Sequence, residues 1–139
     1  MRKSVRKSQR GFTLIELFVV VAIIGVLASL AIPRFMKSSS KVKQAEAKGI
    51  LKQIYVGQRV HHQHYNTYAA NGQSAAAAGS FVALDVEIMA SARYTYVIVA
   101  DSVSFTATAT ANLDDDPTID TWTIDETGKL QCTTNDAEP

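Results

Sequence analysis

Residues 12–33 form an apolar run that contains a single charged side chain, Glu16. At about 1.5 Å per residue, a helix of this length extends roughly 33 Å, enough to cross a bilayer core of about 30 Å. Branched and aliphatic side chains fall on every side of this helix, so it has no polar face to turn toward water. The run is therefore predicted to be a membrane-spanning or fully buried helix, which excludes an amphipathic surface helix.

Two interpretations of the apolar run compete. It could be a cleaved signal peptide, because Ser29-Leu30-Ala31 is a small-residue site of the kind that signal peptidase cuts. Alternatively, only the basic leader before it is removed and the helix is kept. Glu16 favours the second interpretation, because a carboxylate in hydrocarbon costs on the order of 3 kcal/mol and is normally paired. A discarded signal core has no use for such a group.

The residues at the start of the run resemble a known processing signature. Residues 10–17 read Arg-Gly-Phe-Thr-Leu-Ile-Glu-Leu, which is similar to the signature of type IV prepilins and of the related type II secretion pseudopilins. The resemblance covers residues 10–68. It implies that a prepilin peptidase cuts between Gly11 and Phe12 and methylates the new amino terminus of Phe12. It also implies that Glu16 neutralises the Phe12 ammonium of a neighbouring subunit, with pairing inside one chain as the alternative.

The resemblance also implies a division of the chain. Residues 1–11 would be the removed leader, residues 12–34 the transmembrane and filament-core helix, and residues 35–139 a periplasmic or extracellular head that includes the second half of the helix. Gly25 and Pro33 match positions where the family's helix loosens in assembled filaments, and both residue types weaken a helix. We therefore expect a kink at Pro33 in the single subunit and a loosened segment between these residues in the filament.

The function implied by the resemblance is structural. The chain would be a single-pass precursor in the inner membrane and then a pilin in a filament on the cell surface, serving motility, adhesion or DNA uptake. Its partners would be further copies of itself, the prepilin peptidase, and the inner-membrane assembly machinery with its ATPases; nucleic acid is not an expected partner. A pseudopilin of a type II secretion system and a filament with an electron-transfer role are the alternatives. No catalytic constellation is present in the sequence, so an enzyme is not expected.

Residues 42–66 continue a helical pattern, with an apolar stripe expected to pack on a sheet: Ala47, Ile50, Leu51, Ile54, Tyr65 and Tyr68, completed by Gln58 and His61. Six basic residues follow a second line along the helix: Arg34, Lys37, Lys41, Lys48, Lys52 and Arg59. We call them the basic stripe. It is either a solvated face, a contact with an acidic surface of the next subunit (the acidic C-terminal part being the candidate), or a site for anionic lipid or DNA.

The rest of the chain predicts an α+β fold, with the helix on an antiparallel sheet of three or four strands. Residues 94–99 are rich in β-branched and aromatic side chains, and residues 103–111 alternate as in a half-buried strand. Asp101-Ser102 and Glu126-Thr127-Gly128 are predicted turns, and Ile124 is expected to pair with Leu130. Residues 69–79 read as a loop, and residues 81–89 are ambiguous.

No cofactor is expected, with calcium as the one candidate. The acidic loop supplies Asp114, Asp116 and Asp120, whose oxygen ligands suit that ion, although the spacing is not that of an EF-hand. His61 and His64 lie three residues apart, but no third ligand is close in sequence, so a metal site there is not favoured. The single cysteine, Cys132, excludes an intramolecular disulfide and is expected to be buried.

Overall fold

The computed structural model describes residues 11–114 and 116–137. The predicted leader therefore lies outside the described residues, apart from Gly11. The chain divides into two compact units, one ending at Met36 and one comprising Lys37–Pro139. We call the second unit the head and the helical part of the first unit the rod.

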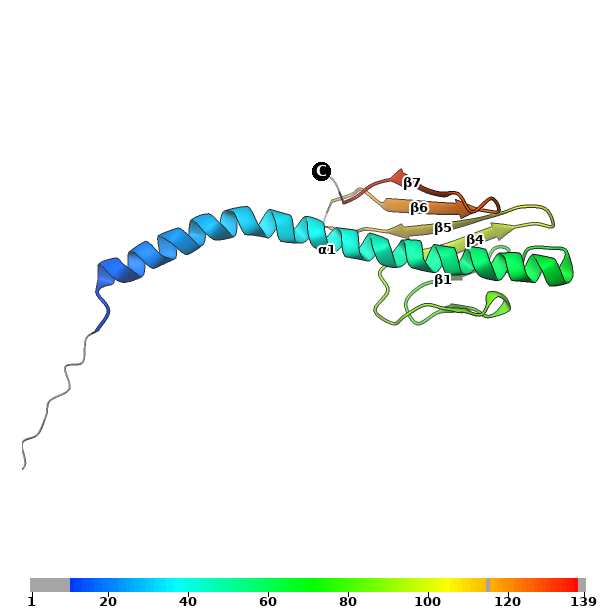
Figure 1. Ribbon diagram of the computed structural model, residues 1–139, viewed down its shortest axis with the longest axis horizontal. Helices are drawn as coiled ribbons and strands as arrows, with labels where there is room; N and C mark the ends of the chain where they lie inside the picture. The colour runs from blue at the N-terminus through cyan, green and yellow to red at the C-terminus, as the bar shows by residue number, and fades with distance from the viewer. Residues whose placement is uncertain (1–10, 115, 138–139) are drawn as a thin grey trace, which may run out of the picture. The chain divides into compact units, whose positions relative to one another are not determined.

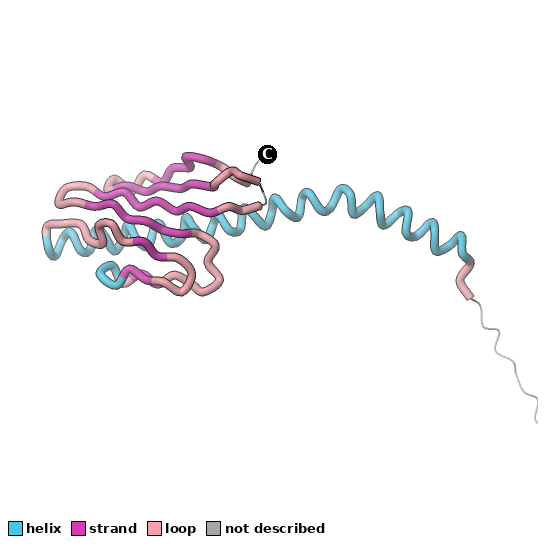
Figure 2. The backbone as a smooth tube through the Cα atoms, turned by 180° about the vertical axis from the view of Figure 1, so that it is seen from behind, coloured by secondary structure: helices cyan, strands magenta, loops and turns pink. Residues whose placement is uncertain are grey.

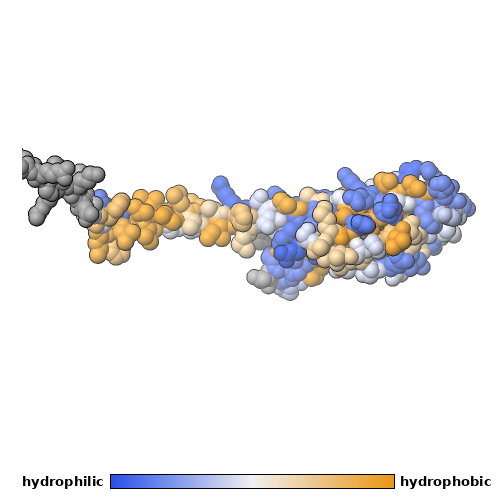
Figure 3. Space-filling view, turned by 90° about the horizontal axis from the view of Figure 1, so that it is seen from below, coloured by the Kyte–Doolittle hydropathy of each residue, from blue (hydrophilic) through white to orange (hydrophobic). Residues whose placement is uncertain are grey.

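Helix α1, Leu14–Tyr65, belongs to both units. In the rod, helical backbone continues through Gly25 and Pro33 without an interruption. An 18-residue window has a mean hydropathy of 2.8 and none of it is buried, so this helix is long and apolar enough to cross a membrane. Figure 3 shows the rod as an almost continuous apolar surface. The sequence prediction of a helix without a polar face is confirmed in the rod.

In the head, a five-stranded antiparallel sheet packs on the second half of α1 (Figures 1 and 2). The strand order is β1-β4-β5-β6-β7, and the bounds are Ser74–Ala75, Thr95–Ala100, Phe105–Ala111, Asp120–Asp125 and Leu130–Thr134. Strands β2 (Ser80–Phe81) and β3 (Val86–Glu87) form a separate hairpin around the short 3₁₀ helix η1 (Val82–Leu84). The α+β class and the helix-on-sheet arrangement are thus confirmed.

The core lies between α1 and the inner face of the sheet. Ala47, Leu51 and Ile54 of α1 are fully buried, as the apolar stripe predicted. The sheet contributes alternate residues, because successive side chains of a strand point to opposite faces. They include Tyr96, Ile98, Phe105, Ala107, Ala109 and Ile124. Gln58 is buried within this layer and uses its amide as both donor and acceptor with the backbone of Ala69.

Several local predictions need correction. The fifth strand, β1, lies inside the segment expected to be a loop, because its two residues complete the ladder of β4. Tyr65 is 70% exposed and does not belong to the packing stripe, since α1 ends there and the sheet does not cover it. Cys132 is exposed rather than buried, because β7 is an edge strand. The predicted pairing of Ile124 with Leu130 and the turn at Gly128 are confirmed.

Candidate functional site

The start of α1 places the predicted processing residues in the open. Gly11, Phe12 and Thr13 precede the helix, and Phe12 is 89% exposed. Nothing lies within 4 Å of the position that a Cβ of Gly11 would occupy. The peptide bond between Gly11 and Phe12 is therefore reachable by an enzyme without any unfolding of the helix.

Glu16 forms a capping box with Thr13. The Thr13 backbone N–H and hydroxyl both donate to Glu16 Oε2 at 2.8 Å, and the Glu16 backbone N–H donates to Thr13 Oγ1 at 3.3 Å. This reciprocal pattern satisfies backbone donors that the first helical turn otherwise leaves without partners. The role of Thr13 was missed in the sequence reasoning, although the spacing Thr-x-x-Glu before an apolar run is its signal.

The rod presents apolar side chains in all directions. Leu17, Ile24 and Leu27 are 63%, 58% and 61% exposed. Ser29 turns its hydroxyl back to the Val26 carbonyl at 2.7 Å, which satisfies it without a second helix. Nothing lies within 4 Å of a Cβ placed on Gly25. The kink expected at Pro33 and the loosening expected between Gly25 and Pro33 in a filament remain predictions.

The basic stripe of the head makes contacts with neutral groups of its own chain. Lys48 Nζ lies 4.0 Å from the centre of the Trp122 ring, and Arg59 donates to the Tyr55 hydroxyl at 3.1 Å. Arg59 is exposed, and its hydrogen bond with the Tyr55 hydroxyl raises the pKa of its guanidinium above the ordinary value. These contacts orient the cations but leave their charges uncompensated. A contact of the stripe with an acidic surface remains a prediction.

The acidic residues of the predicted calcium site separate into two groups. Asp120 is fully buried, where its Oδ2 accepts bonds from Tyr94 Oη at 2.6 Å and Trp122 Nε1 at 2.7 Å. Its Oδ1 accepts bonds from Gln44 Nε2 at 2.8 Å and from the Asp136 backbone N–H at 3.0 Å. With four donors around it, the Asp120 carboxylate is an internal anchor of the head rather than a ligand of the loop.

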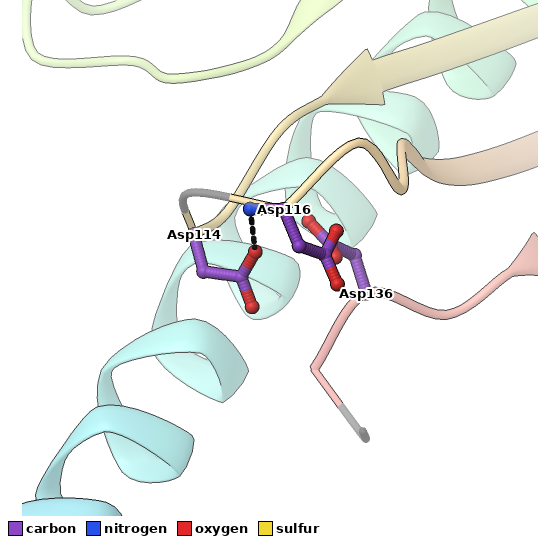
Figure 4. A group of neighbouring side chains, drawn as sticks. All are labelled: Asp114, Asp116 and Asp136. Carbon is purple, nitrogen blue, oxygen red and sulfur yellow. Dashed lines mark hydrogen bonds between the residues drawn. The ribbon is translucent and has the colours of Figure 1, made fainter.

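Asp136 takes the place of Asp120 in the loop cluster. Carboxylate oxygens of Asp114, Asp116 and Asp136 lie within 4.8 Å of one another (Figure 4). Asp136 is 5% exposed, and its pKa is raised by burial and by the neighbouring carboxylates. Three oxygen ligands of this kind suit a hard cation. Calcium binding stays a prediction, now with Asp136 in the ligand set in place of Asp120.

The histidines at the end of α1 have backbone partners. His61 Nδ1 lies 2.9 Å from the Thr67 carbonyl, and His62 Nε2 lies 3.3 Å from the Ser102 carbonyl. Among the described residues, the only group of three or more potential metal-ligating side chains is the aspartate cluster. His61 and His62 therefore join the helix end to the following loop and to the β4–β5 turn.

Comparisons with known proteins locate the similarity at the N-terminus. A family model described as the prokaryotic N-terminal methylation motif matches residues 6–32. A type IV major pilin protein of Myxococcus xanthus, PilA, is 60% identical over 50 residues, which is 36% of this chain and 23% of that protein. The type II secretion system core protein G of Pseudomonas aeruginosa is 49% identical over 49 residues, 35% of this chain and 34% of that protein.

A third relative is also similar over only part of its length. The type IV major alpha-pilin of Moraxella bovis is 48% identical over 44 residues, 32% of this chain and 28% of that protein. The matched segments thus span between about a quarter and a third of these relatives. The family-model match covers residues 6–32, which include most of the rod, and the sheet lies outside it.

Proposed function

We propose that this chain, whose N-terminal segment is that of the type IV pilin family, is a structural subunit that polymerises into a surface filament. The observation that carries the proposal is that the two halves of α1 lie in different environments. Its first half exposes apolar side chains on all sides, while its second half belongs to a head with its own core. Such a rod gains the burial it lacks by entering a bilayer or by packing against other rods.

The first step of this function is removal of the leader. A prepilin peptidase would hydrolyse the exposed amide between Gly11 and Phe12, which leaves an ammonium group on Phe12 that the same enzyme methylates. In the membrane this cation is costly unless an anion is close. Glu16 supplies the anion, and its carboxylate is already oriented by the capping box with Thr13.

The second step is docking. The ammonium of Phe12 on one subunit and the carboxylate of Glu16 on its neighbour are each costly in hydrocarbon, and they become less costly as a pair. Both capping interactions of Glu16 use Oε2, so Oε1 can accept a bond from an incoming amine. The precursor would wait in the inner membrane, and the assembly machinery and its ATPases would then move it into the filament.

The mass of the mature protein tests the processing step. Intact mass spectrometry of the exported subunit should give residues 12–139 plus one methyl group. A product that begins at Ile32 would indicate ordinary signal cleavage after Ala31, and the rod would then be absent from the filament. This result would contradict the proposed function directly.

Three substitutions separate the capping role of Glu16 from its docking role. Glutamine also serves at this position of a capping box, so Glu16→Gln keeps the cap and removes the charge. We expect filament yield to fall at least about tenfold, equivalent to 1.4 kcal/mol per contact, with membrane insertion unchanged. Thr13→Ala is the matched control, because it removes the two hydrogen bonds of the Thr13 hydroxyl and keeps the carboxylate. Glu16→Val removes the charge together with the two bonds that Glu16 Oε2 accepts, and it should behave like Glu16→Gln. Wild-type yield from either Glu16 variant would refute docking.

A pseudopilin of a type II secretion system is the second candidate, because core protein G is also among the similar proteins. A pseudopilin would support secretion without a long surface filament. Shearing of intact cells separates the candidates, since only a pilin would be the main protein of the sheared filaments.

A further inference from the structure

The two flanks of α1 in the head carry different chemistry. From Lys48 to Gly57 the helix turns through about 900°, so these residues point to opposite sides. Lys48 lies over Trp122 of β6. A Cβ placed on Gly57 would lie 2.6 Å from the Leu84 carbonyl oxygen of η1. Figure 1 shows β6 and β7 on one side of this part of α1 and the β2–β3 hairpin on the other.

The flank toward β6 and β7, which we call the basic flank, combines cations with aromatic rings. It contains Lys48 over Trp122 and Arg59 beside Tyr55, and Lys41 is exposed further along the same line of the helix. The contacts of Lys48 and Arg59 are with a ring and a hydroxyl. The flank therefore presents positive charge above half-buried aromatic rings, which suits an acidic partner with apolar side chains.

The opposite flank, which we call the hairpin flank, carries exposed apolar and acidic side chains. Val82, at the start of η1, and Met89, two residues after β3, are 85% and 64% exposed. Asp85 and Glu87 are exposed between them. Asp85 adopts a left-handed backbone with φ of 54°, which turns the chain at the end of η1 and is tolerated by aspartate.

A groove of about 600 Å³ lies between α1 and the hairpin, beside the close contact of Gly57 with Leu84. Val56 and Val60 line its helix wall and are 58% and 51% exposed, and Leu84 lines the hairpin wall. Lys52 is also part of the helix wall, together with two histidines. Exposed apolar side chains gathered around one groove are typical of a protein–protein contact.

We propose that the hairpin flank of one copy binds the basic flank of a second copy of this chain. The inference rests on the proposed function as a polymerising subunit and names the contact between heads. Asp85 and Glu87 would face Lys48 and Arg59, while Met89 would pack on the aromatic surface around Trp122. Because the two flanks lie on opposite sides of α1, each head keeps one flank available after every contact. Such a heterologous contact propagates as an open helical assembly rather than closing as a dimer.

The single native cysteine offers a direct test. Cys132 is exposed and pairs in register with Trp122, so it lies on the basic flank. Met89→Cys adds a second thiol on the hairpin flank. Sheared filaments of this variant, treated with a short bis-maleimide, should give a ladder of dimers, trimers and higher multimers on a denaturing gel. Dimers without higher species would indicate a two-fold contact and would overturn the proposal.

Three control variants complete the test. Val99→Cys places the second thiol on the outer face of the sheet with nearly the same exposure, 63% against 64% for Met89, and should give no ladder. Cys132→Ser combined with Met89→Cys should abolish the ladder. Thr118→Cys examines the acidic β5–β6 loop, and a ladder from this variant in place of Met89→Cys would overturn the proposal.

The outcomes separate this inference from the proposed function. Filaments that form normally but give no ladder with Met89→Cys would overturn the head contact and leave the pilin assignment intact. Absence of filaments from the wild-type chain would contradict the assignment itself. As a second measurement, Asp85→Lys with Glu87→Lys should lower the ladder yield several-fold, and high salt should do the same, since screening weakens exposed ion pairs. Yields indifferent to both changes would contradict the charge pairing.

Discussion

The rod exposes the same kinds of apolar side chain that the head buries. On one continuous helix, Ile24 and Leu27 are 58% and 61% exposed, whereas Leu51 and Ile54 are fully buried. Complete burial of such a side chain contributes about 1.5–3 kcal/mol. The head obtains this contribution from its own sheet, whereas the proposed function would supply it to the rod through lipid or other subunits. One helix thus joins a domain that has its own core to an apolar segment that has none. The predictions below are ordered by how strongly they depend on this difference.

Removal of the rod should have the largest effect. A variant that begins at Lys37 keeps the head, with its own core, and loses the exposed apolar surface. We expect no filaments and a soluble monomer in analytical ultracentrifugation, with the cooperative melting of a folded domain. Filaments formed by the head alone would break the comparison, because they would show that the rod is dispensable for assembly.

Matched truncations on the two halves of α1 should differ by several kcal/mol. Leu51→Ala opens a cavity in the core of the head and should cost about 2–5 kcal/mol of unfolding free energy. Leu27→Ala removes the same atoms from an exposed position and should change the stability of the head by less than about 0.5 kcal/mol. Urea unfolding monitored by Trp122 fluorescence measures both. Equal effects would contradict the division into two units.

Two glycines sharpen the same contrast. A Cβ on Gly57 would lie 2.6 Å from the Leu84 carbonyl oxygen, so Gly57→Ala should destabilise the head by about 1–3 kcal/mol through overpacking. Gly25 has open space around it, so Gly25→Ala should strengthen the rod helix by up to about 1 kcal/mol. If the segment between Gly25 and Pro33 loosens on assembly, the same substitution should lower filament yield. Unchanged yield would contradict the loosening.

Two tyrosines in the head core separate a satisfied hydroxyl from an unsatisfied one. Tyr94 donates to the Asp120 carboxylate at 2.6 Å, whereas the buried Tyr96 hydroxyl has no hydrogen-bond partner among the described residues. Burial raises the pKa of both phenols, so both stay neutral. Tyr94→Phe should cost about 1.5 kcal/mol, and Tyr96→Phe should be close to neutral or stabilising. Equal losses in chemical denaturation would indicate an unrecognised partner of Tyr96, such as a bridging water.

The sequence predicted features that depend on neighbours along the chain. The apolar rod, the alternating strand that contains Phe105, and the turn at Gly128 each have a local signal, and each was predicted correctly. The capping role of Thr13 also had a local signal that was overlooked. What failed depends on long-range contacts. Cys132 was expected to be buried because free cysteines usually are, but only the strand order reveals that β7 is an edge.

The charged sites show the same limit. Asp120 was placed with the acidic loop because it follows that loop in sequence. In the fold, its carboxylate turns inward to Tyr94 and Trp122, and Asp136, which follows β7 in the sequence, occupies the loop cluster instead. Sequence spacing could not reveal this exchange, because the pairing of β6 with β7 brings the C-terminal residues back to the start of β6.

The smallest predicted effect concerns Asp136, whose carboxylate lies in the acidic loop cluster of the head. Burial and the neighbouring carboxylates raise its pKa, so the folded head holds this proton more tightly than the unfolded chain does. Protonation of Asp136 therefore favours folding at low pH, and this contribution is lost as the pH rises from the ordinary aspartate pKa through the raised one. Asp136→Asn keeps an acceptor for the Leu113 N–H at 2.7 Å and removes the charge.

This substitution should make the head slightly more stable than wild type at neutral pH, with the difference vanishing near pH 4. Calcium would reverse the order if it binds the three carboxylates, because the wild type would then gain stability that the variant lacks. Melting temperatures of both proteins at pH 7, with chelator and with millimolar calcium, measure the reversal. A difference that is the same in both conditions would contradict calcium binding, and a less stable variant in chelator would contradict the electrostatic account. The comparison of the two conditions therefore tests whether the head needs a bound cation for its full stability, as the rod needs lipid or other subunits for burial of its apolar side chains.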